Sequence, residues 1–462
     1  MTAHMGRKRQ HRSRQRGPLG RCRKAVEELR LGTAKWNPFR ELASQRETAR
    51  TGIQTSTVQA AGVYLPVAAP TLGSSGVVIG TELHSGRAFI YDPFILYGDR
   101  LPAGHVLLLG RSGRGKSSCA KTYVMRQLAF RDRAFAVLDA QGDGERGEWD
   151  DIASELGITP VRITPGVKDG VRVNPLDASI PDELQLMLLR AIVELSRGTD
   201  LGTDERFALK VALERGRAAA AAAGRVPVLS DVLAALTAPL PAQLGEREID
   251  AMEMLAWGEG PALALDELID GPLGGSFDGE TSTDIDLEGR LVIFDLSSVD
   301  RSSAALPILM AILSVWLRWS WITPGDGVRR TLIVEEAWDI IRHTSVADLF
   351  LELLKYGRRL GLSLWFVMHH ISDSDVSPAA KAILKLTDTR VIYGLNRDEA
   401  EETAKALQLP DWATATISDP AIMRPGTALW AVGARSMLVQ HKRTSYEVAV
   451  TNTNKGMQGE AA

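Results

Sequence analysis

The apolar residues of this chain fall into two kinds of segment that alternate along most of its length. Short, almost wholly apolar runs are typical of strands that are buried on both faces of a sheet. Between them lie segments with the apolar spacing of amphipathic helices. This alternation predicts an α/β fold with a mostly parallel central sheet. The expected strands are 106–109, 135–138, 161–163, 291–294, 332–334, 364–368, 391–395, 429–432 and 437–440, with 446–450 as a further edge strand.

The pattern changes between residues 181 and 266. This segment is rich in Ala, Leu, Glu and Arg and contains no strand-like run. Helices are expected at 185–196, 204–223, 229–236 and 248–255. We therefore predict an all-helical subdomain at 181–266, inserted into an α/β domain made of residues 101–180 and 267–450.

The two ends of the chain differ from this core. Short β-like runs predict a small β element at 61–100, and residues 451–462 are expected to be a flexible tail. Residues 1–60 are polar, with nine Lys or Arg from Arg7 to Lys24 and no acid before Glu27, and we expect a disordered basic arm. The arm suits an electrostatic contact with nucleic acid or an anionic membrane surface, or it is a solvated tail.

Composition narrows the class of protein. A hydrophobic content of 45% and a charged content of 24% are those of an ordinary soluble protein. With only two cysteines in 462 residues, a structural disulfide is not expected and a reducing cytoplasm fits. The longest apolar run, 304–317, ends at Arg318 and is too short to span a bilayer, so it is expected to be a buried helix.

The most informative motif is GRSGRGKS at 110–117, which directly follows an apolar strand and opens a helix-like segment. Its glycines let the backbone curl so that consecutive N–H groups face an anion. Lys116 supplies a positive charge for the β- and γ-phosphates, and Ser117 a hydroxyl for Mg²⁺. A chance glycine-rich turn is disfavoured by the strand and helix around it. The expected ATP-binding residues are Gly110, Arg111, Ser112, Gly113, Arg114, Gly115, Lys116, Ser117 and Ser118.

Two acids follow another expected buried strand. Glu335 and Glu336 come directly after the apolar run 332–334, at the strand end where open α/β sheets place ligands. Neighbouring residues on a strand point to opposite faces, so the two need not share one role. We assign Glu335 to the Mg²⁺ shell and Glu336 to polarising the attacking water. The alternative is a surface acidic pair, which the apolar strand before it disfavours.

Together, GRSGRGKS and EEAW at 335–338 resemble the HerA–FtsK superfamily of hexameric P-loop motors. Within it, the chain is most similar to the conjugal-transfer or type IV secretion ATPases of the VirB-four/TraC type, including actinobacterial members. The resemblance covers residues 80 to 445, and its order of motifs is more specific than any one of them. The further matching stretches are GRAFIYDPF at 86–94, VLDAQGD at 137–143, VNPLD at 173–177, FDG at 277–279 and VIFDLS at 292–297.

The resemblance implies a RecA-like core and a Mg²⁺-dependent ATPase that energises conjugative DNA transfer or type IV secretion. It also implies a homo-oligomeric ring, a hexamer, that works with membrane-embedded channel components from the cytoplasmic side of the inner membrane. DNA would be contacted through the basic arm or the ring interior. The alternatives are a DNA translocase like FtsK or a coupling protein, and a nucleotide-gated scaffold with low turnover.

Two positions depart from the family pattern. Glu335 stands where most members carry Asp, and Met368-His369 stands where many carry Thr-Gln. The resemblance assigns the second position a contact with the γ-phosphate or the attacking water, which His369 can still make. The alternative for His369 is a packing role at the end of a strand.

A ring motor also needs a cation at the neighbour's phosphates. Arg358 and Arg359 are our candidates, because the resemblance places basic residues between the Glu-Glu strand and the His369 strand. A solvated basic turn is the alternative. Arg390 and Arg435 are lesser candidates.

Overall fold

The computed structural model describes residues 72–167, 170–271, 274–283, 285–301, 303–322, 325–369, 371 and 377–452. The predictions for the basic arm at 1–60 and for 453–462 of the tail lie outside the described residues. So does the first part of the β element predicted at 61–100.

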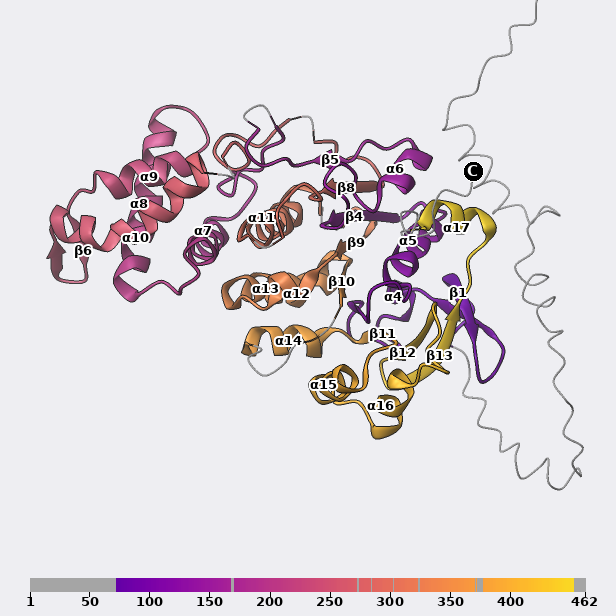
Figure 1. The fold of residues 1–462 in the computed structure, drawn as a ribbon. Helices are drawn as coiled ribbons and strands as arrows, with labels where there is room; N and C mark the ends of the chain where they lie inside the picture. Colours follow the sequence, from indigo (N-terminus) through magenta and orange to yellow (C-terminus); the bar gives the residue numbers. More distant parts are fainter. Residues whose placement is uncertain are drawn as a thin grey trace, which may run out of the picture.

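One large sheet organises the described part of the chain (Figure 1). Its eleven strands have the order β2-β1-β13-β12-β11-β3-β10-β9-β4-β8-β5. The strands from β11 to β5 in this order are all parallel, whereas β12, β13, β1 and β2 form an antiparallel extension. The mostly parallel α/β fold predicted from the apolar runs is therefore confirmed. The strands are β1 (Val77–Glu82), β2 (Ala88–Tyr91), β3 (Val106–Leu109), β4 (Arg133–Asp139), β5 (Val161–Arg162), β8 (Leu291–Asp295), β9 (Arg329–Val334), β10 (Leu362–Met368), β11 (Thr389–Tyr393), β12 (Thr427–Val432) and β13 (Arg435–His441).

Helices cover both faces of the sheet, as the wholly apolar strands require. Alternate residues of β3 enter opposite cores: Val106 and Leu108 pack with residues of α5, and Leu107 and Leu109 with the core that contains α11 and α13. This alternation follows from the two-residue period of a strand. The helices of this domain are α4 (Pro93–Leu96), α5 (Lys116–Gln127), α6 (Asp150–Leu156), α11 (Ala305–Ser320), α12 (Ala337–Ile341), α13 (Thr344–Leu360), α14 (Pro378–Leu386), α15 (Arg397–Leu407), α16 (Asp411–Ser418) and α17 (Ser445–Thr451).

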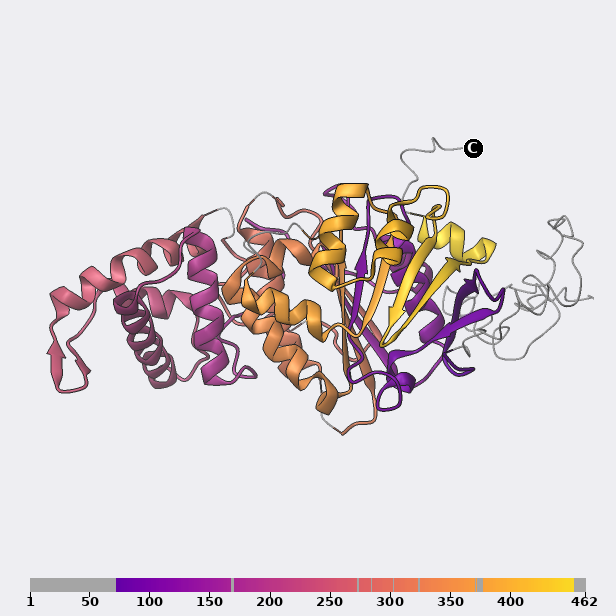
Figure 2. The ribbon, with the colours of Figure 1, turned by 90° about the horizontal axis from the view of Figure 1, so that it is seen from below.

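The inserted segment projects from one side of the sheet domain (Figures 1 and 2). It contains α7 (Asp182–Arg197), α8 (Thr203–Ala222), α9 (Leu229–Thr237) and α10 (Ala251–Asp270), and α7 packs against α11 and α13. The prediction that it is wholly helical was wrong at one place. β6 (Ala242–Leu244) and β7 (Arg247–Ile249) form a hairpin around Gly245, whose φ is +62°. Strands this short carry no readable two-residue pattern.

Helix α11 contains the longest apolar run of the chain, and its residues from Ala305 to Leu317 are all buried. The prediction of a buried helix here is confirmed. Among the described residues, no helix combines the length and the apolar character needed to cross a bilayer.

The last element corrects a prediction. Residues 446–450 form part of helix α17, not an edge strand. The hydroxyl of Thr444 accepts a hydrogen bond from the backbone N–H of Glu447, and the Glu447 carboxylate accepts one from the Thr444 N–H. This reciprocal capping box starts a helix and outweighs the β propensity of Tyr446, Val448 and Val450.

Candidate active site

The loop between β3 and α5 has a backbone that only glycine accommodates at two points. Gly110 has φ +148° and Gly115, which precedes α5, has φ +113°. A Cβ atom on Gly110 would lie 2.5 Å from the Cβ of Tyr393 on the neighbouring strand β11. The loop therefore passes closely over the sheet, and its backbone N–H groups at the start of α5 can face an anion.

Elements from the second half of the chain hold this loop. The carbonyl of Arg114 accepts a hydrogen bond from the N–H of Gly426 at 2.9 Å, and the Arg111 guanidinium donates to Asn396 Oδ1 at 2.8 Å. Ser118 Oγ donates to the carbonyl of Thr451 in α17 at 3.3 Å. The tip of the loop, at Ser112 and Gly113, is exposed. The tip of the loop is therefore open to solvent, whereas the rest of the loop is held in place by these hydrogen bonds.

The Lys116 ammonium is turned back onto its own loop. Lys116 Nζ donates to the carbonyls of Gly110 at 2.5 Å and Arg111 at 3.3 Å, and lies 3.1 Å from His369 Nδ1. Burial lowers the pKa of Lys116 to about 8, although the nearby carboxylates of Glu335 and Glu336 oppose this shift. The ammonium is therefore desolvated and held by neutral acceptors that a phosphate could replace.

Glu335 is a fully buried carboxyl group at the end of β9. Its backbone N–H donates to Leu138 of the adjacent strand β4, and its Oε1 accepts a hydrogen bond from Trp149 Nε1 at 3.4 Å. Its Oε2 has no hydrogen-bond partner among the described residues. Burial raises the pKa of Glu335 to about 8, with further contributions from the charges of Glu148 and Asp139. An orphaned carboxylate oxygen in this position is a place for a cation or a cation-bound water.

Glu336 faces the phosphate side with a strained backbone. Its φ of +49° lies in the left-handed region, which costs a residue other than glycine about 1 kcal/mol. Its Oε1 accepts hydrogen bonds from Gln141 Nε2 and from His369 Nε2, the latter at 3.0 Å. Burial alone would raise the pKa of Glu336, but the hydrogen bond from His369 and the positive charges of Arg301 and Lys116 hold it below its ordinary value. Glu336 is therefore an ionised acceptor.

His369 joins the lysine to this carboxylate. Because the Lys116 ammonium can only donate, His369 Nδ1 accepts its hydrogen bond, and the ring proton lies on Nε2, which donates to Glu336. The structure thus brings Lys116, Glu336 and His369 into one hydrogen-bonded chain. Both ring nitrogens of His369 have polar partners and 30% of its side chain is exposed, which favours a role in the site over the packing alternative.

Sequence reasoning assigned no role to several residues beside these groups. Gln141 follows β4 and contacts Glu336, whereas Asp139 ends β4 and has a pKa raised to about 7 by burial. Trp149 donates its backbone N–H to Asp139 at 2.9 Å, and the buried Lys121 donates to the carbonyl of Glu148 at 2.6 Å. In the sequence, the stretch VLDAQGD at 137–143 matched the family pattern, but it did not indicate which of its side chains lie in the site.

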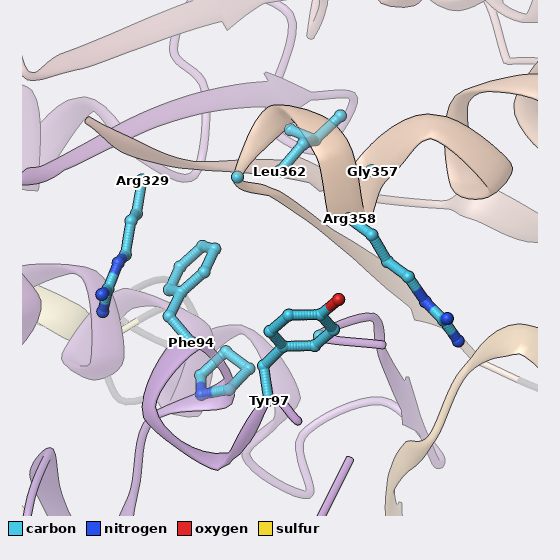
Figure 3. A pocket seen from close by; sticks show the side chains of 9 residues that line it. Phe94, Tyr97, Arg329, Gly357, Arg358 and Leu362 are labelled. Carbon is cyan, nitrogen blue, oxygen red and sulfur yellow. The ribbon is translucent and has the colours of Figure 1, made fainter. Parts of the chain in front are cut away.

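The predicted trans-acting arginines lie elsewhere. Arg358 and Arg359 are exposed in the last turn of α13, at the ends of the parallel strands opposite the P-loop. Arg358 lines a pocket of about 140 Å³ together with Arg329, Phe94 and Tyr97 (Figure 3). Within one chain these arginines therefore do not reach Lys116.

The two lesser arginine candidates also lie apart from the P-loop lysine. Arg390 donates to the backbone carbonyl of Leu407 at 2.9 Å, which indicates a structural role. Arg435 begins β13 and pairs with Val432 of β12.

No protein-family model matches the chain, and no curated protein matches it. Solved structures do. VirB4 of Thermoanaerobacter pseudethanolicus is 18% identical and matches with a TM-score of 0.68 over 82% of this chain and 100% of that chain. The bacterial conjugative coupling protein TrwB, in its unbound monoclinic form, is 16% identical with a TM-score of 0.54 over 80% and 90% of the two chains. TrwB in complex with the ATP analogue ADPNP is also 16% identical, with a TM-score of 0.54 over 80% and 91%. The chain therefore has the α/β fold of VirB4 and of the conjugative coupling protein TrwB, which confirms the predicted fold class and matches the resemblance seen in its motifs.

Proposed function

We propose that this chain is an ATP-hydrolysing motor that energises conjugative DNA transfer or type IV secretion. The observation that carries the proposal is the hydrogen-bonded chain from Lys116 of the P-loop through His369 to Glu336. It joins a phosphate-binding loop to a candidate base within one site. The likeness in fold to VirB4 and TrwB supports the kind of work that such a site would drive.

ATP binding would use groups that are already in place. The N–H groups at the start of α5 would hold the phosphates, and the Lys116 ammonium would exchange the carbonyl of Gly110 for the β- and γ-phosphates. This exchange favours the charged lysine, because an anion then replaces neutral acceptors. It also releases His369 Nδ1, which as a bare nitrogen accepts a hydrogen bond. His369 would therefore contact the attacking water and not a phosphate oxygen.

The residues also fit a magnesium ion. The buried, unpartnered Oε2 of Glu335 is a suitable oxygen for a Mg²⁺-bound water, and Ser117, at the start of α5, carries the hydroxyl expected of this position. When bound, Mg²⁺ would neutralise charge on the β- and γ-phosphate oxygens. Glu335 would then be held ionised, since a cation beside a carboxylate favours its charged form.

Glu336 would act as the general base for hydrolysis. As the water oxygen forms a bond with the γ-phosphorus, a water O–H bond breaks and the proton passes to the Glu336 carboxylate. The bond from the γ-phosphorus to the bridging oxygen breaks, and ADP leaves with that electron pair. The lowered pKa of Glu336 keeps the carboxylate ionised before the reaction.

A ring of copies would complete the site. Arg358 and Arg359 lie at the opposite ends of the parallel strands from the chain's own P-loop, so the nucleotide they could reach is that of a neighbouring copy. A head-to-tail arrangement of this kind closes into a ring, which we expect to be a hexamer. We expect the ring to lie in the cytoplasm against membrane-embedded channel components, with DNA at the basic arm or the ring interior.

ATP turnover in the presence of Mg²⁺ tests the proposal. Lys116→Ala should lose nucleotide binding, whereas Glu336→Gln should bind ADPNP but hydrolyse ATP at least about 100-fold more slowly. Glu401→Gln, on the exposed face of α15, is the matched control. Wild-type turnover by Glu336→Gln would refute the base, and ATP binding without turnover by the wild type would indicate a nucleotide-gated scaffold.

The fold likeness to TrwB favours one alternative, a coupling-protein-like DNA translocase. DNA separates the two functions. A translocase should hydrolyse ATP faster when DNA is added, and this stimulation should fall steeply with salt because phosphate contacts release counterions. ATPase activity that is indifferent to DNA would favour the secretion motor.

A further inference from the structure

Gln141 lies at the junction of the candidate base and its histidine. Its Nε2 donates a hydrogen bond to Glu336 Oε1 and lies 3.3 Å from His369 Nε2. It comes from the loop that follows β4, whereas Glu336 follows β9 and His369 follows β10. Three strand ends therefore meet at one carboxylate oxygen.

The backbone of Gln141 is held on both sides. Its N–H donates to Asp139 Oδ1 at 3.2 Å, and its carbonyl accepts a hydrogen bond from the N–H of Glu148 at 3.0 Å. The next residue, Gly142, has φ +155° and pairs with Gly147 across the loop. The Gln141 amide is thus presented from a closed loop with a defined backbone, as a group that orients another must be.

The side chains that donate hydrogen bonds to Glu336 contact one of its two carboxylate oxygens, Oε1. His369 Nε2 carries the ring proton, because Nδ1 accepts from Lys116, so both His369 and Gln141 donate to Oε1. Among the described residues, no side chain is hydrogen-bonded to Glu336 Oε2. Two donors on Oε1 fix the rotation of the carboxylate and leave Oε2 as the oxygen that can receive a proton.

We propose that Gln141 is a positioning residue that holds the Glu336 carboxylate so that Oε2 faces the attacking water. This inference rests on the proposed function, in which Glu336 is the base. Gln141 keeps its own protons throughout, and the proton of the water goes to Oε2. The contact between Gln141 and Glu336 involves neither Lys116 nor the phosphates.

The test removes the hydrogen-bond donor of Gln141 and keeps the length of its side chain. Gln141→Met keeps the reach of the side chain and lacks the N–H group. We expect kcat for ATP to fall at least about tenfold, with KM and the affinity for ADPNP within about twofold of wild type, because the lost contact orients the base and does not bind substrate. Gln141→Lys restores a donor and should recover part of kcat. Gln243→Met, on the exposed β6–β7 hairpin, is the matched control.

A double variant separates positioning from a general effect on the fold. If Gln141 acts through Glu336, Gln141→Met should slow the Glu336→Gln protein no further, since the base it orients is already absent. An additive loss would overturn the proposal, as would wild-type kcat in Gln141→Met or a raised KM with unchanged kcat. These outcomes are distinct from failure of the proposed function, which would appear as wild-type turnover by Glu336→Gln alone.

Discussion

A buried histidine gives a prediction whose size follows from the structure. His105 precedes β3, and its Nδ1 accepts a hydrogen bond from the N–H of Leu364 at 3.1 Å. Its Nε2 therefore carries the proton and donates to the carbonyl of Leu354 at 3.2 Å. Burial lowers the pKa of His105 from 6.5 to about 4; the charge of Arg358 adds to the shift and the contact with Leu354 opposes it.

The sign of the effect on stability follows from the two pKa values. As the pH falls below 6.5, His105 takes up a proton in the unfolded chain but not in the folded protein until the pH nears 4. Protonation thus favours unfolding across this window by about 1.4 kcal/mol per pH unit. The full shift corresponds to a loss of about 3 kcal/mol of unfolding free energy.

Urea unfolding of the nucleotide-free protein, followed by tryptophan fluorescence, measures this loss. Other groups also titrate in acid, so the quantity to compare is the slope of unfolding free energy against pH. Between about pH 6 and pH 4.5, the slope of His105→Gln should be shallower than that of the wild type by about 1.4 kcal/mol per pH unit. His84→Gln, at an exposed site, is the control. Parallel curves for wild type and His105→Gln would refute the reasoning.

Three further predictions concern the site and its supports. Glu335→Gln should raise the unfolding free energy when no divalent cation is present. Burial raises the pKa of Glu335 to about 8, so the wild type loses stability as the pH rises from 4.5, and the variant does not. Urea unfolding at about pH 8 measures this difference. The same variant should lose its stabilisation by Mg²⁺ and ADPNP. Gly110→Ala should weaken ADPNP binding at least about tenfold in a titration and lower the melting temperature, because its Cβ would lie 2.5 Å from the Cβ of Tyr393. Arg126→Met should lower the unfolding free energy by about 3 kcal/mol and increase hydrogen exchange in α17. In the wild type, Arg126 Nε lies 2.7 Å from Glu447 Oε1, and the variant leaves this buried carboxylate without its cation.

The sequence by itself determined the features that depend on near neighbours along the chain. The sequence predicted the P-loop because the backbone at Gly110 and Gly115 needs glycine and because Lys116, directly after Gly115, is the cation that phosphates require. The apolar runs predicted strands buried on both faces, because such strands need apolar residues at consecutive positions. The helix at 445–451 is equally local, because the capping box formed by Thr444 and Glu447 outweighs the β propensity that predicted a strand at 446–450.

Only the tertiary structure decided which side chains meet. A two-residue period tells which face of a sheet a residue occupies, but not which strand lies beside it. The order β3-β10-β9-β4 places Lys116, His369, Glu336 and Gln141 at the ends of four adjacent strands, although they are up to 253 residues apart along the chain. That order depends on contacts between segments far apart in the sequence, which no local pattern specifies. The partners of Glu336, and the burial that raises the pKa of Glu335, exist only once this packing is complete.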